Sequence, residues 1–556
     1  MGFDDLLDQV GGVGKFQVIQ LVFLAIPICF TTPQLLLENF SGAIPAHRCR
    51  IPLLDNHTGS SGVLGNLSTE ALLRVSIPLD QNQKLEKCHR FSQTQWPLLT
   101  ENGTGPQPHE PATEPCEDGW VYDRSVFTST FVTEWDLVCE LLPQKAMSQS
   151  IYMAGILLGS IIYGHISDRF GRKSVLIWAY LQLGMASTGV AFSPTLTIYR
   201  LLRFLSAFAL AGIMINTGSL ILEWTPTVSR AFFMMMFVAC YSVGHLVLAG
   251  FAYAIRDWRS LQVAVSVPFF AIFLYSWGYA ESARWLSMAG RPGQALKELR
   301  KVARINRKAV AKGCLTIEML RSLSQDELTA AKSHYTVIDL FRLPALRRIS
   351  CCITLASFAV TFSFYGQSLD LQDLGGNLFL TQTLFGSVDF LAKLMAYIFL
   401  NHLSCRTTLS VFMVLSGLFL LANIFVPADQ PGLRVGFAVI GIGCLGTAVS
   451  CITLCVGELY PTVLRQTSSG LDHVSRRIGG ILAPLWRIMG GHFSLLPTIF
   501  YGAIPITAGI AVLFLPETQN RPLPDTIQDV EGWKSSRQQR LQDPKQEDFS
   551  DKITQF

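Results

Sequence analysis

The fold is decided by Gly164-His-Ile-Ser-Asp168-Arg169-Phe-Gly171-Arg172-Lys173, a short charged stretch between two long apolar runs. The runs cover residues 146–163 and 174–193, and each can cross a bilayer as a helix, at about 20 residues per crossing. A turn this short makes the two helices antiparallel neighbours. The glycines permit the reversal, Asp168 can cap or pair near a helix end, and the basic groups favour the cytoplasmic face. An ordinary positively charged loop is the simpler alternative.

The composition is that of an all-α polytopic membrane protein. Of the 556 residues, 50% are hydrophobic and 15% are charged, and the apolar residues are gathered into blocks. The first block begins near Phe16, and it is too long, with no cleavage site after it, for a removed signal peptide. We therefore expect it to be the first membrane span.

The charges indicate which loops face which side. Residues 41–140 contain 7 Lys or Arg and 13 Asp or Glu, whereas residues 281–348 contain 14 and 6. Three N-x-S/T sequons, at Asn56, Asn66 and Asn102, fall in the acidic region, and a fourth, at Asn39, lies at its edge. The acidic region is therefore expected to be extracellular and glycosylated, and the basic region cytoplasmic.

Cysteine usage agrees with this orientation. Cys49, Cys88, Cys116 and Cys139 lie in the acidic region, and an even number of cysteines in an oxidising compartment predicts two disulfides. Three connectivities remain open. The other nine cysteines are expected to be packing thiols.

Twelve spans are predicted, in two six-helix halves. They begin near Phe16, Ala146, Ser174, Thr197, Ala231, Ser260, Arg348, Gly376, Thr407, Leu433, Gln466 and Leu495. The expected divisions are a cytoplasmic N-terminus (1–15), a first half (16–280) with an extracellular loop (41–144), a cytoplasmic loop with amphipathic helices (281–347), a second half (348–516) and a cytoplasmic tail (517–556). Linked halves of this kind occur in transporters that hold a substrate near the midplane.

A charge inside a span requires a pair, a water-filled cavity or a ligand, because burying it costs about 2.5 to 3.5 kcal/mol on insertion scales. Arg477 precedes Gly479-Gly480, where small residues let helices approach or leave room for a ligand. Its planar guanidinium suits a carboxylate, sulfate or urate anion. The alternative is that Arg477 only pairs with Asp472. Arg476 points about 100° away, so at most one of the two faces the cavity centre.

Lys393 follows Asp389 by four residues, so the two share one helical face. A local ion pair and a cavity-facing cation are both open. Aromatic side chains in the fifth and seventh spans could enclose a flat anion, although such residues are more often ordinary packing.

The chain has no phosphate-binding G-x-x-x-x-G-K-[S/T] loop, no spaced metal-ligand cluster and no nucleophile elbow. ATP hydrolysis, a cofactor, a metal, enzymatic activity and a nucleic-acid partner are therefore not expected.

The opening stretch resembles the signature loop of the major facilitator superfamily. Further blocks, Val121–Thr130, Glu134–Cys139, Glu281-Ser-Ala-Arg-Trp-Leu286, Glu458–Arg465 and Pro516–Gln519, resemble the organic anion branch of the organic ion transporter (solute carrier 22) family over nearly the whole chain. Leu36–Phe40 and the closing Thr-Gln-Phe are most similar to the subgroup of urate and steroid-sulfate transporters.

The resemblance implies a plasma-membrane exchanger of organic anions in an epithelial cell, with a mono- or dicarboxylate counter-anion. Arg477 stands where cation carriers of the family have Asp, and the basic residue of the eighth span is Lys393. Tyr and His occupy positions 241, 365 and 473, where urate transporters have Phe, Phe and Gln. The substrate-binding candidates are Arg477, Lys393, Tyr241, His245, Phe362, Phe364, Tyr365, His473, Met214 and Asn216.

Gating is expected from cytoplasmic ion pairs that form and break during alternating access. The resemblance assigns this role to Asp168, Arg172, Glu281, Arg284, Glu458 and Arg465. Thr554 and Phe556 end the chain like a PDZ-domain ligand. A non-transporting receptor or scaffold, a facilitative uniporter, a channel and a cation carrier are the alternative functions.

Overall fold

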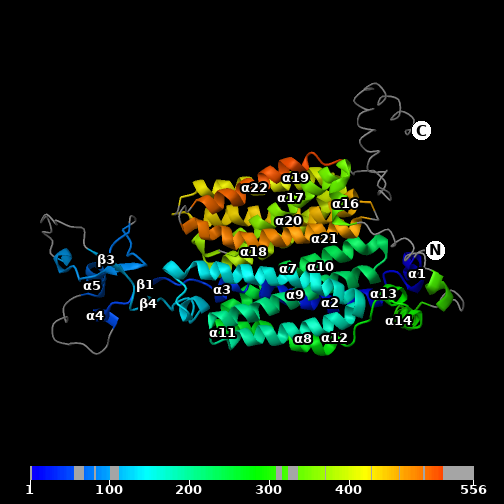
Figure 1. The fold of residues 1–556 in the computed structure, drawn as a ribbon, viewed down its shortest axis with the longest axis horizontal. Coiled ribbons are helices and arrows are strands. Elements are labelled where there is room, and N and C mark those ends of the chain that lie inside the picture. Colours follow the sequence, from blue (N-terminus) through cyan, green and yellow to red (C-terminus); the bar gives the residue numbers. More distant parts are fainter. Residues whose placement is uncertain are drawn as a thin grey trace, which may run out of the picture.

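The computed structural model describes residues 3–55, 68–80, 83–99, 112–308, 316–322, 336–369, 371–427, 429–461, 464–491 and 495–517. The glycosylation candidates Asn56, Asn66 and Asn102 and the tail residues Thr554 and Phe556 lie outside these ranges. In Figure 1 a long helical bundle carries a small domain at one end, and the N-terminus lies at the other. We name these the loop end and the terminal end.

The first half of the bundle is built from long apolar helices joined by short connections. Proline 268 separates the sixth span into two helices, since it cannot donate the hydrogen bond that a continuous helix needs. The elements are α1 (Phe3–Val10), α2 (Lys15–Leu36), α3 (Glu38–Ser41), α7 (Pro143–Phe170), α8 (Arg172–Ala191), α9 (Leu196–Trp224), α10 (Thr227–Ala254), α11 (Trp258–Ser266) and α12 (Pro268–Ser276).

The second half repeats this arrangement after a segment of shorter helices at the terminal end. The described helices of this segment are α13 (Ala283–Met288), α14 (Pro292–Ile305) and α16 (Val337–Arg342). The half contains α17 (Pro344–Ser368), α18 (Leu378–His402), α19 (Cys405–Ala422), α20 (Pro431–Leu459), α21 (Arg465–Ile488) and α22 (Leu496–Val512), with the short turns η3 (Leu371–Leu374), η4 (Asn423–Phe425) and η5 (Met489–Gly491).

The domain at the loop end is small and held by two disulfides. Cys49 is bonded to Cys116, and Cys88 is bonded to Cys139, which selects one of the three expected connectivities. Two antiparallel strand pairs, β1 (His47–Cys49) with β4 (Trp120–Tyr122) and β2 (His89–Phe91) with β3 (Thr113–Pro115), lie beside the bonds. Its short helices are α4 (Pro52–Asp55), α5 (Thr69–Ser76), α6 (Phe131–Glu134), η1 (Trp96–Leu99) and η2 (Cys139–Leu141).

The helix count is consistent with twelve spans. Within the described ranges, ten helices are long and apolar enough to cross a membrane, and α22 is a shorter apolar helix. The remaining one, α21, has 24 residues but is polar, because it carries the charged cluster that begins at Asp472. Every predicted span start lies within four residues of a helix start.

The charged stretch at residues 164–173 differs from the sequence prediction in one respect. Residues 164–170 continue helix α7, and Gly171 alone separates α7 from α8. Gly171 has φ +96°, a backbone conformation that favours glycine, and a Cβ there would meet Glu281 Oε2 at 2.4 Å. The reversal is therefore tighter than the ten-residue turn that was expected.

The two halves meet closely at the loop end. Asn39 Nδ2 donates to the carbonyl of Ser368 over 2.7 Å, and the Ile44 amide donates to Gln372 over 2.8 Å. The Phe379 ring of α18 stacks on Phe40 with 5.4 Å between centroids. The loop end is therefore sealed by polar and aromatic contacts between the halves.

One cysteine expectation is wrong. Cys405, at the start of α19, is bonded to Cys455 near the end of α20, whereas both were expected to be packing thiols. The two residues are far apart in the sequence, and only the packing of α19 against α20 brings their sulfur atoms together.

Candidate functional site

The charge that faces the space between the halves belongs to Arg477, in the middle of α21. Its Nη2 lies 4.0 Å from the sulfur of Met214 in α9, across the interface. Its charge also acts on the hydroxyl groups of Tyr152, Tyr241 and Tyr365, from α7, α10 and α17. Within the described ranges, no carboxylate approaches Arg477 to 4.0 Å. A half-buried cation among hydroxyl groups and without a counter-charge is suited to an anionic ligand.

The neighbouring charges on α21 pair with each other. Arg476 Nη2 lies 2.9 Å from Asp472 Oδ2, and Asp472 also accepts a hydrogen bond from Ser357 in α17. Arg476 donates a further bond to Thr453. The alternative that Arg477 pairs with Asp472 is therefore not what the structure contains, because Arg476 takes that place.

Two glycines bring α17 against α21 beside Arg477. A Cβ at Gly479 would meet the carbonyl oxygen of Phe358 at 2.7 Å, and one at Gly480 would meet the Tyr365 ring at 3.2 Å. Their missing side chains let Tyr365 come close enough for the charge of Arg477 to act on its hydroxyl group. The sequence thus positions the tyrosine hydroxyl through the two glycines that follow the arginine.

His473 precedes Arg477 by one helical turn and lies on the same face. Its side chain is exposed, and the charge of Arg477 acts on it. Among the candidates, His473, Tyr241, Tyr365 and Met214 are therefore the ones that interact with Arg477 or its charge.

Lys393 has a different environment. Its Nζ lies 2.6 Å from Asp389 Oδ2 and donates to Ser242 Oγ (2.9 Å) and the Val238 carbonyl (3.4 Å) of α10. All three ammonium donors are used, so the local ion pair is the alternative that the structure contains. Because Ser242 belongs to the first half, this cluster, which we call the Lys393 seam, joins the halves.

His245 lies one turn further along α10 and is also engaged across the interface. Its Nδ1 accepts from Gln382 Nε2 over 2.9 Å, and Gln382 in turn approaches Asn39 at 3.4 Å. Gly386 permits the close approach, since a Cβ there would meet the His245 Cβ at 2.6 Å. His245 therefore connects the interior with the sealed loop end.

The remaining candidates pack within one half. Phe362 is buried, with its ring 5.5 Å from Phe358 and 5.1 Å from Tyr501, and Phe364 contacts Tyr365 edge to face at 5.5 Å. Asn216 accepts from Ser167 and donates to the Gly212 carbonyl, so both ends of its amide are occupied between α7 and α9. These positions match the packing alternative.

At the terminal end, α7, α8 and α9 are tied together around Arg172. Its guanidinium lies 3.1 Å from both Asp168 and Glu223. The Glu281 carboxylate accepts from the backbone amides of Arg172 (3.0 Å) and Lys173 (3.2 Å). Burial raises the pKa of Glu281, although these amide bonds oppose the rise. The described contacts of this cluster join the first half to the start of the segment that follows it, at Glu281, and do not reach the second half.

The other gating candidates occupy the ends of their helices. Arg284 lies in the first turn of α13, and Glu458 lies at the end of α20. Arg465 begins α21, and in the described ranges its Nε and Nη2 are buried without a hydrogen-bond partner. Buried donors without a hydrogen-bond partner are costly, so these two nitrogens of Arg465 are available to a further acceptor.

Sequence reasoning missed Tyr152 and Ser242. Tyr152 is buried, the charge of Arg477 acts on it, and its hydroxyl donates to the Gln34 carbonyl. The available signal was a tyrosine in an otherwise apolar span, where its hydroxyl requires a partner. No group of three or more His, Cys, Asp or Glu that could hold a metal occurs in the described ranges.

Two six-helix halves that enclose an accessible cation at mid-depth have the architecture of a secondary membrane transporter. Comparison with known proteins supports this assignment to the membrane transporters. The sequence model described as Major Facilitator Superfamily matches residues 143–484. The chain is 50% identical to human solute carrier family 22 member 12 (96% of each chain) and 49% identical to human member 11 (97% of this chain, 98% of that one). It is 48% identical, over the whole of both chains, to the human protein named steroid transmembrane transporter SLC22A24.

The chain belongs to the major facilitator superfamily and, within it, to solute carrier family 22. It is accordingly a multi-pass membrane transporter and not an enzyme. The fold is also similar to the inward-open xylose transporter XylE from E. coli, with a TM-score of 0.56 and 14% identity over 71% of this chain and 90% of that one. This likeness concerns the fold alone.

Proposed function

We propose that this chain carries organic anions across the plasma membrane by alternating access, in exchange for intracellular mono- or dicarboxylates. The observation that carries the proposal is the environment of Arg477: a half-buried guanidinium with no described carboxylate within 4.0 Å, beside Met214 of the other half, with the nearby carboxylate of Asp472 already taken by Arg476. A cation carrier would require the opposite charge at this place.

Sulfated steroid conjugates and urate are the proposed substrates. A fork of guanidinium donors fits two oxygens of a sulfate or carboxylate, and the Tyr241 and Tyr365 hydroxyl groups add hydrogen-bonding partners that phenylalanine would lack. Met214 offers a soft apolar contact for a steroid or a flat ring. The relative named as a steroid transmembrane transporter supports the steroid class.

We further propose that the loop end is extracellular and the terminal end cytoplasmic. The two disulfides of the loop domain are typical of an oxidising compartment. The sequons at Asn56, Asn66 and Asn102 belong to the same region of the sequence, and the basic residues gather in the loop at 281–348. Under this orientation Thr554 and Phe556 would reach a cytoplasmic PDZ domain.

The conformation described is then closed on the outside. Asn39 and Phe40 contact the second half at the loop end, whereas at the terminal end the Asp168 side chain is 76% exposed and two buried nitrogens of Arg465 have no hydrogen-bond partner among the described residues. We propose that Asp168 and Arg465 gain partners across the cytoplasmic interface when that side closes. Arg172, Glu281, Arg284 and Glu458 are the other proposed gating residues.

The test is uptake of labelled estrone sulfate, urate and tetraethylammonium into cells that express the chain, with and without preloaded glutarate or lactate. Anion uptake that rises on preloading supports the exchanger and identifies its substrate class. Anion uptake that is insensitive to preloading would instead indicate a uniporter. Cation uptake, or none despite normal surface protein, would refute the proposal and favour a cation carrier or a receptor.

A further inference from the structure

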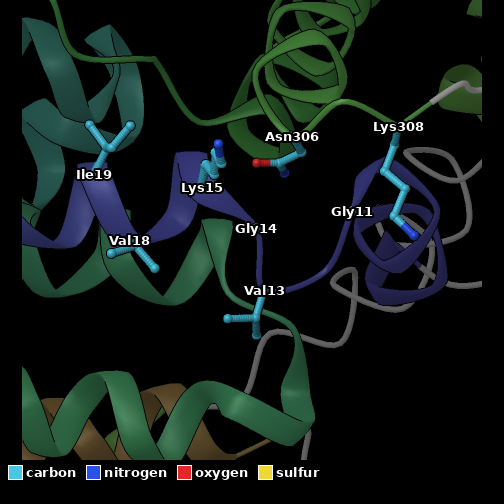
Figure 2. Close-up of a pocket in the computed structure, with 8 residues that line it drawn as sticks. All are labelled: Gly11, Val13, Gly14, Lys15, Val18, Ile19, Asn306 and Lys308. Atoms are coloured by element: carbon cyan, nitrogen blue, oxygen red, sulfur yellow. The ribbon is translucent and has the colours of Figure 1, made fainter.

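A groove at the terminal end lies outside the proposed substrate pathway. It has a volume of about 620 Å³ and is lined by Gly11, Val13, Gly14, Lys15, Val18, Ile19, Asn306 and Lys308. Figure 2 shows the groove where the joint between α1 and α2 meets the chain that leaves α14, with Lys15 and Lys308 on opposite sides of Asn306.

At the base of the groove, the Asn306 side chain is hydrogen bonded to the start of α2. Asn306 Oδ1 accepts from the Phe16 amide over 2.8 Å, and its Nδ2 donates to Gln17 Oε1 over 3.1 Å. A Cβ at Gly14 would meet the Asn306 amide at 2.3 Å, and one at Gly11 would meet it at 2.9 Å. Because Gly11 and Gly14 have no side chain, the Asn306 side-chain amide can pack directly against their backbone, and this contact fixes the positions of the lining residues.

The charged residues that line the groove are both basic, and the Asp8 carboxylate of α1 lies beyond its rim, next to Gly12. Lys15 and Lys308 are both exposed, and no described carboxylate lies within 4.0 Å of either ammonium group. None of the eight lining residues is acidic. Two free ammonium groups on one concave surface match a ligand with more than one negative charge.

The apolar wall of the groove continues along the membrane-spanning part of α2. Val18, Ile19, Val22 and Phe23 are 51%, 49%, 53% and 44% exposed. They lie about one helical turn apart on one face of a helix whose membrane span begins at Lys15. This face is therefore suited to hydrocarbon chains, and the two lysines stand at the depth of the headgroups.

We propose that the groove binds one anionic phospholipid with a phosphorylated headgroup, such as a phosphoinositide. The headgroup phosphates contact Lys15 and Lys308, and the acyl chains lie along Val18, Ile19 and Val22. The inference rests on the proposed function only for the leaflet, which is the cytoplasmic one if the terminal end is cytoplasmic. A free phosphate could supply the same headgroup chemistry, but it would not use the apolar face.

The test is lipid binding to the purified full-length chain in detergent micelles, measured by native mass spectrometry with dioleoyl phosphatidylinositol 4-phosphate and with dioleoyl phosphatidylcholine. We expect the phosphoinositide to bind at least tenfold more tightly. Lys15→Gln combined with Lys308→Gln should weaken its binding about 25-fold, because each lysine contributes about a factor of five. Both lysines are exposed, so the variant should keep its melting temperature.

The matched control is Lys297→Gln with Lys301→Gln, which removes the same charge from exposed positions of α14 outside the groove. Its affinity should stay within about threefold of the parent chain. Equal losses in the two variants would overturn the proposal, since a diffuse basic surface would then bind the lipid.

A second variant, Val18→Asn with Ile19→Asn, tests the acyl chains and should weaken the lipid without changing the binding of inositol 1,4-bisphosphate. Equal affinity of the parent chain for that soluble headgroup and for the lipid would also overturn the proposal. Binding does not require transport. Lipid binding by a chain that carries no anion would therefore refute only the proposed function, and normal anion uptake without lipid binding would refute only this inference.

Discussion

Replacing Arg477 with glutamine is expected to abolish most anion uptake while leaving the protein folded. In the described ranges, the guanidinium has no carboxylate partner, so its removal leaves no buried counter-charge behind. What is lost is a charge-assisted contact with the substrate, worth about 1.5 to 3 kcal/mol. The ratio of maximal uptake to KM should therefore fall roughly 10- to 150-fold.

The neighbouring arginine provides a matched control with the opposite result. Arg476→Gln removes the same charge from the same helix, but it leaves the Asp472 carboxylate, which is 4% exposed, without its 2.9 Å partner. Breaking such a buried pair costs about 3 to 5 kcal/mol. We expect less Arg476→Gln protein at the cell surface, with nearly normal uptake for each molecule that arrives.

The assay combines initial rates of estrone sulfate and urate uptake with surface biotinylation, so that transport is expressed for each surface molecule. Arg477→Lys should recover part of the activity, because it keeps the charge but not the planar fork of donors. Normal uptake per molecule in Arg477→Gln would refute the assignment of Arg477 to the substrate. An equal loss of surface protein in both arginine variants would show that Arg477 is structural.

Three further outcomes follow from contacts elsewhere in the bundle. Asp389→Asn and Lys393→Met should each lower the free energy of unfolding by about 3 to 5 kcal/mol, with a lower melting temperature and less protein at the cell surface. The double variant should recover most of this stability, and no recovery would mean that Asp389 and Lys393 are not a coupled pair. Gly171→Ala should destabilise the chain by about 1 to 3 kcal/mol in thermal unfolding, because of its φ and its contact with Glu281, and an unchanged midpoint would contradict the reversal described. Digestion of the unreduced protein should give linked peptides that contain Cys405 with Cys455, whereas free thiols at both positions would contradict that bond.

Most of the architecture could be predicted because its signals are local. Each span is a continuous apolar block, so the helix starts followed from the sequence to within four residues. The position of the turn was predicted correctly, but the predicted turn was longer than the single residue, Gly171, that separates α7 from α8. A residue with φ +96° reverses the chain by itself, and the apolar pattern does not distinguish a charged last helical turn from a loop.

The partners within the candidate site could be predicted only in part. Asp389 and Lys393 share a helical face, and so do Asp472 and Arg476, because four residues separate the members of each pair. The contact of Lys393 with Ser242 joins residues 151 positions apart, and that of Arg477 with Met214 joins residues 263 apart. Such contacts depend on how the halves pack, and hydrophobic patterning carries no information about that packing.

The Lys393 seam also has a mechanical consequence. Lys393 lies 15 residues from the start of α18 at Leu378, a lever arm of about 22 Å at 1.5 Å per residue. If the halves rotate by roughly 15° about an axis through the seam, the far end of this lever sweeps about 6 Å, enough to separate Phe379 from Phe40. An atom about 3 Å from the axis sweeps less than about 1 Å, a displacement that a hydrogen-bonded ammonium group can follow by changing its rotamer. The contacts at the loop end could thus break in every transport cycle while the Lys393 seam stays hydrogen bonded.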